Sequence, residues 1–246
     1  MILLVDAGNT RIKWVLWNDG QFVRRGHVLH RGSDRALLGE QLWGTLERPA
    51  QVVIASVAGT ELVGTLNRWI SETWAVPVHC AVSEAAGFGI TSAYAVPAQM
   101  GADRWVGMIG ARNRIARASC VVDCGTAITI DALSATGVHR GGVIFPGIRL
   151  MRESLYRDTR QIPEEHNGQV VLFGASTRDC VWGGTVHAVA TAIDGITGRM
   201  REELGEESLC LLTGGDAETL LPYLRGRYRL EPDLIFHGLL VIAGQA

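Results

Sequence analysis

The chain has 246 residues, 47% of them hydrophobic and 20% charged, which is enough for one large or two small domains with a substantial core. A formal net charge of -2 leaves no basic excess, so we expect neither nucleic-acid binding nor attraction to an anionic membrane. The longest uncharged stretch, residues 85–102, contains glycine and proline and is not a membrane span. The five scattered cysteines form no C-x-x-C pair, so we expect buried thiols in a cytoplasmic protein.

The first half of the chain predicts strands and helices in the order βββ-α-β-α-β. Its second strand alternates, with Ile12, Trp14 and Leu16 on one face and Lys13, the only lysine of the chain, on the other. An Asn-Asp-Gly sequence then signals a hairpin turn. The expected strands cover residues 2–5, 11–17, 21–29, 51–58 and 77–82, and the expected helices cover residues 33–46, capped by Ser33, and 60–74, capped by Thr60.

The second half repeats this opening. An apolar run again ends in Asp-x-Gly at Asp123, nearly half the chain after Asp6, and two further strands follow it. Two copies of one pattern indicate two related α/β units in tandem, joined by a helix over residues 101–116. The other elements expected here are strands at 128–133, up to 145 and at 208–212, and helices at 148–157, at 176–204 and up to 224.

The Asp-x-Gly turns carry the first chemical signal. Glycine allows a tight turn in which backbone N–H groups approach an anion, and an aspartate at the end of a strand can orient a hydrated Mg²⁺. One such turn is commonplace, but two copies in equivalent places suggest two lobes that close on a nucleotide. Lys13 follows the first turn, where an ammonium group would face phosphate; a coding preference for arginine elsewhere is the simpler explanation of its isolation.

Three further clusters each have a structural alternative. Asp103 and Arg104 open the helix at 101–116, where an acidic residue also serves simply to cap the helix. Arg104 is either a surface charge or a bidentate clamp for a carboxylate. The sequence Phe-Gly-Ala-Ser-Thr at 173–177 is also explained as a loop and cap before a helix. Thr-Gly-Gly-Asp at 213–216 is a turn from a strand into a helix, and such turns bind nucleotides or only make the turn.

Together these motifs resemble those of the type III pantothenate kinases, in order and spacing. The resemblance runs from Ile2 to the closing segment at 232–240, and that family belongs to the acetate and sugar kinase/Hsp70/actin superfamily. It is carried by Asp-Ala-Gly-Asn-Thr at 6–10, Tyr94, Gly-Ala-Asp-Arg at 101–104, Asp-Cys-Gly-Thr-Ala-Ile-Thr at 123–129, Gly-Gly-Val-Ile-Phe-Pro-Gly at 141–147 and Thr-Gly-Gly at 213–215.

The resemblance implies a site, residue by residue. Asp103 would accept the proton of the pantothenate hydroxyl, Asp6 would lie near Mg²⁺, and Asp123 would bind an activating monovalent cation, K⁺ or NH₄⁺. The residues implied in ATP binding are Asp6, Ala7, Gly8, Asn9, Thr10, Arg11, Ile12, Lys13 and Thr126, and those implied in pantothenate binding are Tyr94, Gly101, Ala102, Asp103, Arg104 and Thr177. His79, His139 and the cluster at 164–166 match no motif, and we expect solvated or core roles for them.

The implied activity is ATP-dependent phosphorylation of pantothenate to 4'-phosphopantothenate, the first step of coenzyme A biosynthesis. The implied fold is α/β, with two ribonuclease H-like (actin-like ATPase) domains, residues 1–116 and 117–246, and a nucleotide cleft between them. The family is homodimeric, so a homodimer is expected. Two alternatives stay open: another small-molecule kinase of the same superfamily, such as a sugar kinase, and an ATP-binding regulatory or accessory protein.

Overall fold

The computed structural model describes residues 1–246 except 31, 33, 163, 165–166, 206 and 245–246. The chain folds into two compact units. The first unit comprises Met1–Ile115 and Asp233–Ala246, and the second comprises Ala116–Pro232. The sequence had suggested a division into 1–116 and 117–246; the carboxyl-terminal segment belongs instead to the first unit, because its helix packs there.

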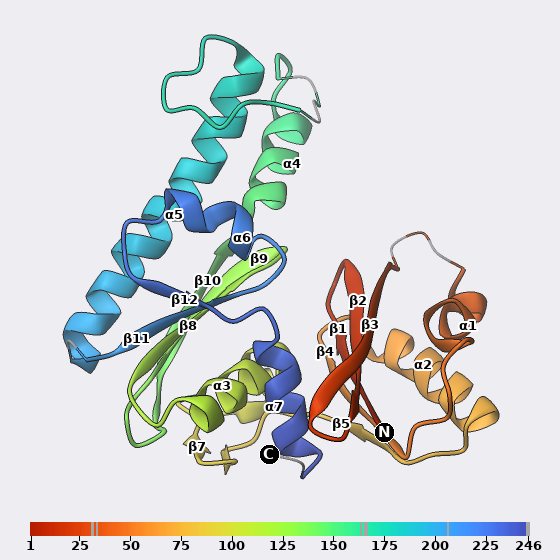
Figure 1. Ribbon diagram of the computed structural model, residues 1–246. Helices are drawn as coiled ribbons and strands as arrows, with labels where there is room; N and C mark the ends of the chain where they lie inside the picture. The colour runs from red at the N-terminus through yellow and green to blue at the C-terminus, as the bar shows by residue number, and fades with distance from the viewer. Residues whose placement is uncertain (31, 33, 163, 165–166, 206, 245–246) are drawn as a thin grey trace. The chain divides into compact units, whose positions relative to one another are not determined.

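The first unit contains a mixed five-stranded sheet in the order β3-β2-β1-β4-β5 (Figure 1). Strands β1, β2 and β3 are antiparallel neighbours, whereas β4 runs parallel to both β1 and β5. The β2–β3 hairpin turns through Asp19 and Gly20, which both have positive φ, as the two-residue turn that follows strand twist requires. The strands are β1 (Ile2–Ala7), β2 (Arg11–Asn18), β3 (Gln21–Leu29), β4 (Gln51–Ser56) and β5 (Val78–Cys80).

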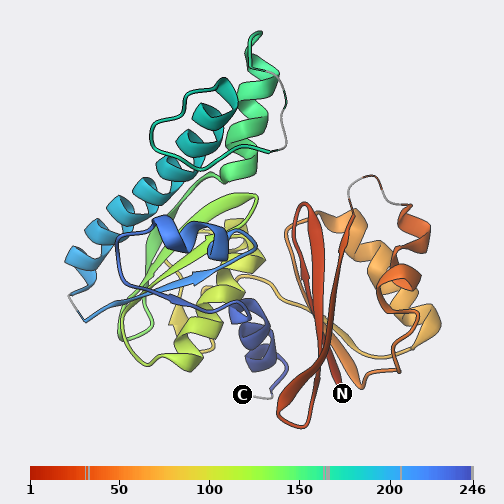
Figure 2. The same ribbon diagram turned by 45° about the horizontal axis from the view of Figure 1, so that its top comes forward.

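Helices pack on both faces of this sheet, although its edge strand β3 is largely exposed. One face packs on α1 (Leu38–Trp43) and α2 (Thr60–Thr73), and its core contains the three alternating residues of β2 that the sequence placed together. Those residues are Ile12, Trp14 and Leu16. The opposite face packs on the helices α3 (Ala102–Arg114) and α7 (Leu234–Ile242), which lie on the other side of the sheet from α1 and α2 (Figure 2).

Helices α3 and α7 approach each other closely at two glycines. A Cβ on Gly110 would meet the carbonyl oxygen of Leu234, and one on Gly238 would meet the carbonyl oxygen of Val106. Because glycine alone leaves room for backbone against backbone, these two positions set the spacing of the helices. The start of α3, which carries Asp103 and Arg104, is thereby held by α7, an element from the far end of the chain.

The second unit repeats the same sheet. Its strand order is β10-β9-β8-β11-β12, which matches the first sheet strand for strand, with β8–β9–β10 antiparallel and β11 parallel to β8 and β12. The repeat inferred from the two Asp-x-Gly motifs is therefore confirmed at the level of topology. The strands are β8 (Ser119–Cys124), β9 (Ala127–Leu133), β10 (His139–Pro146), β11 (Leu209–Thr213) and β12 (Tyr228–Leu230).

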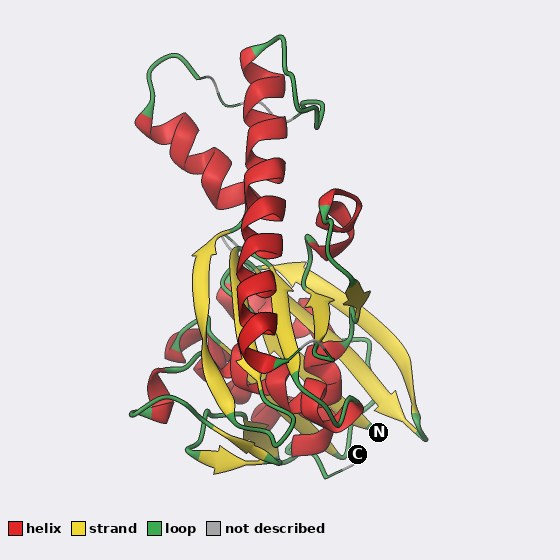
Figure 3. Ribbon diagram, turned by 90° about the vertical axis from the view of Figure 1, so that its left-hand side faces the viewer, coloured by secondary structure: helices red, strands yellow, loops and turns green. Residues whose placement is uncertain are grey.

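Two long helices distinguish the second unit. Helix α4 (Ile148–Asp158) packs on α5 (Thr177–Leu204), and both extend past the end of their own sheet (Figure 3). Only the later part of α5, around Val186, Val189 and Ile193, joins the core of the unit. A short helix, α6 (Ala217–Leu220), follows β11. None of the described helices is both long and apolar enough to cross a membrane.

The structure corrects several local predictions. The helix expected at 33–46 is shorter, because a 3-10 turn at Arg35–Leu37 precedes α1. The residue that caps this 3-10 turn is Asp34, whose Oδ1 accepts from the N–H of Ala36 at 2.9 Å. The expected cap, Ser33, lies outside the described residues. The thiols are not all buried: all five cysteines are free, but Cys80 and Cys180 are exposed. Strand β12, helix α7 and the hairpin of β6 (Ala86–Gly87) and β7 (Ile90–Thr91) were not predicted.

Candidate functional site

Asp6 and Lys13 form a cross-strand pair at the end of β1. They are direct partners in the β1–β2 ladder, so both side chains point to the face of the sheet that α3 and α7 cover. Burial raises the pKa of Asp6 to about 6; the positive charge of Lys13 opposes this rise, and the negative charge of Asp103 adds to it. The carboxylates of β1 and α3 are therefore close enough to interact, next to one ammonium group.

The turn between these strands is held by its own backbone. The N–H of Gly8 donates to the carbonyl of Arg11 at 3.0 Å, and the carbonyl of Gly8 lies 2.8 Å from Nε2 of His30, a contact that the sequence did not suggest. Asn9 is exposed at the turn. Ala7 and Ile12, both predicted in the ATP loop, have fully buried side chains, so only their backbone could meet a ligand.

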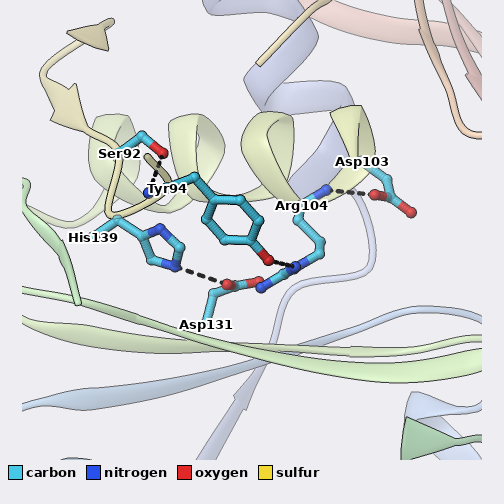
Figure 4. Close-up of polar contacts among 6 residues, drawn as sticks. All are labelled: Ser92, Tyr94, Asp103, Arg104, Asp131 and His139. Carbon is cyan, nitrogen blue, oxygen red and sulfur yellow. Dashed lines mark hydrogen bonds and ion pairs between the residues drawn. The ribbon is translucent and has the colours of Figure 1, made fainter. Parts of the chain in front are cut away.

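The start of α3 presents Asp103. Its Oδ1 accepts from the N–H of Arg104 at 2.7 Å, which satisfies one of the free donors of the first helical turn and supports the capping interpretation in part. Figure 4 shows its other oxygen pointing away from Arg104. A Cβ on Gly101, the residue that precedes the helix, would lie 2.6 Å from Oδ1 of Asp103, so glycine leaves room for this carboxylate.

Arg104 is buried and held by Tyr94. Its Nη1 donates to the phenol oxygen of Tyr94 at 2.8 Å, and the guanidinium carbon lies 5.6 Å from the centre of the same ring. Tyr94 is positioned in turn by Ser92, whose hydroxyl accepts from the N–H of Tyr94 at 3.2 Å (Figure 4). A guanidinium fixed in this way suits bidentate binding of a carboxylate better than a flexible surface arginine would.

In the second unit, three separate glycine motifs meet around the β8–β9 turn. A Cβ on Gly147 would lie 2.8 Å from the carbonyl oxygen of Thr126, and one on Gly214, whose φ is 97°, would lie 2.5 Å from the carbonyl oxygen of Cys124 and also meet the carboxylate of Asp123. The N–H of Asp216 donates to the carbonyl of Cys124 at 2.8 Å. The sequence identified the segments at 123–129, 141–147 and 213–216 separately; the fold brings them together.

The remaining candidates are placed as follows. Thr177 is the exposed first residue of α5, and the preceding Ser176 caps this helix by accepting from the N–H of Asp179 at 3.1 Å. His139 is buried, with Nε2 at 2.9 Å from Asp131, which confirms a core role (Figure 4). His79 is exposed, as a solvated role requires. Of the cluster at 164–166, residues 165 and 166 lie outside the described residues.

The donor set near β1 fits Mg²⁺. Asp6 supplies carboxylate oxygens, which Mg²⁺ prefers, close to the carboxylate of Asp103. Among the described residues, no group of three or more His, Cys, Asp or Glu side chains could hold a metal ion without such a partner. Mg²⁺ typically keeps several waters and uses one or two carboxylates together with substrate phosphates. At the β8–β9 turn, the carboxylate of Asp123 offers an oxygen donor beside a glycine-lined backbone.

Comparison with known proteins agrees with these motifs. The family model of the type III pantothenate kinases matches residues 2–199. Curated type III pantothenate kinases from Nitrosospira multiformis and Nitrosococcus oceani are 38% and 34% identical, over 99% of this chain in each case and over 91% and 94% of their own lengths.

Two solved structures share the fold at low identity. A conserved putative Baf family transcriptional activator from Campylobacter jejuni has a TM-score of 0.62 at 19% identity, covering 99% of this chain and 100% of its own. A putative 2-dehydro-3-deoxygalactonokinase from Sinorhizobium meliloti has a TM-score of 0.61 at 14% identity, covering 99% and 98%. On its sequence, motifs and fold, the chain belongs to the type III pantothenate kinases, a family of phosphotransferases that phosphorylate pantothenate in coenzyme A biosynthesis.

Proposed function

We propose that this protein transfers the γ-phosphoryl group of ATP to the hydroxyl of pantothenate in the cytoplasm. The observation that carries the proposal is the arrangement in the first unit, where Asp6, Lys13 and Asp103 interact and Arg104, next to Asp103, is buried against Tyr94. A phosphate-facing pair on the sheet and a carboxylate-binding arginine on the helix that covers it match the two ends of this reaction. Five free thiols are in keeping with a reducing compartment.

Asp103 is the proposed proton acceptor. Arg104 and Tyr94 would hold the pantothenate carboxylate, so that the hydroxyl is presented to Asp103 in a fixed orientation. In a loose phosphoryl-transfer transition state the hydroxyl proton leaves late, so a carboxylate that orients the oxygen serves even though it is a weak base. The hydrogen bond from the N–H of Arg104 holds one oxygen of Asp103 in place for this task.

Lys13 and the backbone of residues 6–12 are proposed to bind the ATP phosphates, together with Thr126 in the second unit. The ammonium group of Lys13 would neutralise charge on the phosphoryl oxygens, and the turn at Gly8 and Asn9 would supply neutral donors. Asp6 is the proposed holder of hydrated Mg²⁺. The ion held there would supply positive charge to offset the negative charge that spreads over the phosphoryl oxygens.

Asp123 is proposed to bind a monovalent cation, K⁺ or NH₄⁺. Its carboxylate lies against Gly214, whose positive φ only glycine adopts easily, and a side chain there would meet both Asp123 and the backbone of Cys124. The resemblance to the family supplies the identity of the ion, and Thr177 is proposed as a further pantothenate contact on the same ground.

We also propose that the protein is a homodimer that associates through the second unit. Leu172 and Phe173 are 69% and 91% exposed, although the loop that carries them is packed tightly: a Cβ on Gly183 of α5 would meet the carbonyl oxygen of Val171. Ile144 on the edge strand β10 is 60% exposed. Large apolar side chains held out to solvent by a fixed backbone are typical of an interface.

A coupled ADP-release assay tests the activity. We expect ADP formation that depends on pantothenate, is not supported by hexoses, and is high in potassium buffer but low in sodium buffer. ADP release that hexoses stimulate and pantothenate does not would refute the substrate assignment. Equal rates in the two buffers would remove the role of Asp123. Sedimentation of Phe173→Asp beside the unsubstituted protein tests the dimer, which the substitution is expected to dissociate.

A further inference from the structure

His30 lies just past the end of β3, beside the turn that the proposed ATP site uses. Strand β3 pairs with β2 up to Leu29, which is opposite Arg11, so the next residue comes level with the turn that precedes β2. There the N–H of His30 donates to the carbonyl of Thr10 at 3.3 Å, and its ring nitrogen Nε2 lies 2.8 Å from the carbonyl oxygen of Gly8. One half-buried residue thus holds two carbonyls of this turn.

The contact between the His30 ring and Gly8 has only one possible direction. A carbonyl oxygen accepts hydrogen bonds and does not donate them, so Nε2 of His30 carries the proton and donates to Gly8. In a planar trans peptide, the C=O and the N–H of the next residue point in opposite directions. Because the bond from His30 holds the carbonyl of Gly8, it also sets the direction in which the N–H of Asn9 points.

Little else holds this peptide. Among the described residues, the bond from His30 is the one hydrogen bond on either polar atom of the Gly8–Asn9 peptide, and the N–H of the exposed Asn9 is left for a ligand or for water. A Cβ on Gly8 would have a single neighbouring atom within 4 Å, the carbonyl oxygen of Arg11 at 3.4 Å. Since glycine also permits backbone rotations that other residues resist, this peptide depends on His30 for its orientation.

We propose that His30 is a positioning residue of the nucleotide site, which directs the N–H of Asn9 at a phosphate group of ATP. The inference rests on the proposed function of this turn, and it gives His30 no contact with the reacting atoms. A peptide turned over at Gly8 would present its carbonyl oxygen to the phosphates in place of a donor. By preventing this rotation, His30 keeps the donor in place before the nucleotide binds.

Two substitutions of His30 test whether the donor at the position of Nε2 matters. Glutamine carries an N–H at about the distance of Nε2 from the backbone, whereas the amide of asparagine is one carbon shorter and does not reach Gly8. The test variants are therefore His30→Asn and His30→Gln, which are both polar. The matched control is His79→Asn, the same change at an exposed histidine of β5 in the same sheet.

Each protein is titrated with MgATP by calorimetry without pantothenate, and is then assayed for ADP release with ATP and pantothenate varied in turn. We expect His30→Asn to weaken MgATP binding about tenfold and to raise KM for ATP by a similar factor, because a hydrogen bond to a charged acceptor is misdirected. Its KM for pantothenate should be unchanged. His30→Gln should recover most of the affinity for ATP, and His79→Asn should bind ATP like the unsubstituted protein.

Three results would overturn this inference alone: unchanged ATP affinity in His30→Asn, equal losses in the two His30 variants, or a rise of KM for both substrates, which indicates a structural role. In each case the unsubstituted protein would still phosphorylate pantothenate. If the unsubstituted protein does not bind MgATP, the proposed function and this inference fail together. If it binds MgATP but does not use pantothenate, only the acceptor is wrong, and the calorimetric comparison still decides the role of His30. Circular dichroism checks that each variant is folded.

Discussion

Because α7 contacts α3 closely at a glycine, we expect replacement of that glycine by alanine to destabilise the protein. The same replacement in α2, at a glycine without such a contact, is expected to stabilise it. In Gly238→Ala the new Cβ would meet the carbonyl oxygen of Val106 and lie 2.8 Å from its Cγ1, and the carbonyl belongs to backbone that cannot rotate away. Alanine gains about 1 kcal/mol over glycine in a helix, whereas overpacking costs about 1–3 kcal/mol. Because the clash involves backbone, we place its cost at the upper end and expect a net loss of about 1–2 kcal/mol.

The matched control is Gly64→Ala in α2, where a Cβ would meet nothing within 4 Å. Here only the helical preference operates, and we expect a gain of about 0.5–1 kcal/mol. Urea unfolding of each variant measures the difference: with an m value of about 2 kcal/mol/M, Gly238→Ala should lower the midpoint of the first unit by about 0.5–1 M. If Gly238→Ala proves as stable as Gly64→Ala, the close approach of α3 and α7 does not require glycine, and the idea that α7 positions the start of α3 fails.

Four further predictions concern the candidate site. Asp103→Asn should fold normally, since an amide oxygen can still accept from the N–H of Arg104, but its kcat should fall about 10²–10⁴-fold; near-normal turnover would leave Asp103 as a capping residue. Arg104→Ala should raise KM for pantothenate and leave KM for ATP unchanged, which steady-state kinetics with each substrate varied would show; equal losses would mean a structural role. Lys13→Arg should raise KM for ATP or lower kcat, because the compact ammonium group opposite Asp6 is replaced by a wider planar group; unchanged constants would attribute the single lysine to composition. Asp6→Asn should be more stable than the unsubstituted protein above about pH 6, by up to about 3 kcal/mol, and equally stable below about pH 3. The folded pKa of Asp6 is about 6 and the ordinary value is 3.8, so the stability that is fully present below 3.8 is lost as the pH rises to 6. Urea unfolding in magnesium-free buffer, with Glu47→Gln as an exposed control, measures the difference, and a difference that does not change with pH would contradict this prediction.

The sequence by itself determined most of the local structure and the family. Local signals were enough for this, because each depends only on the period or the backbone geometry of its own element. They are the alternation at Ile12, Trp14 and Leu16, the Asn-Asp-Gly turn and the repeated Asp-x-Gly motif. The repeat then led to two units with the same strand order. Short elements were missed: β12 has three residues, and α7 is apolar almost throughout, so neither shows a clear period.

Only the tertiary structure decided which of these residues meet. Asp6 lies opposite Lys13 because of the register of strands β1 and β2. Asp103 is close to Asp6 because α3 packs on the sheet, and this packing depends on glycines and on α7 from the end of the chain. The same holds for Gly147 and Gly214 around the β8–β9 turn and for the contact of His30 with Gly8. Such interactions join residues far apart in the chain, and their free energy depends on distances and burial that no local pattern encodes.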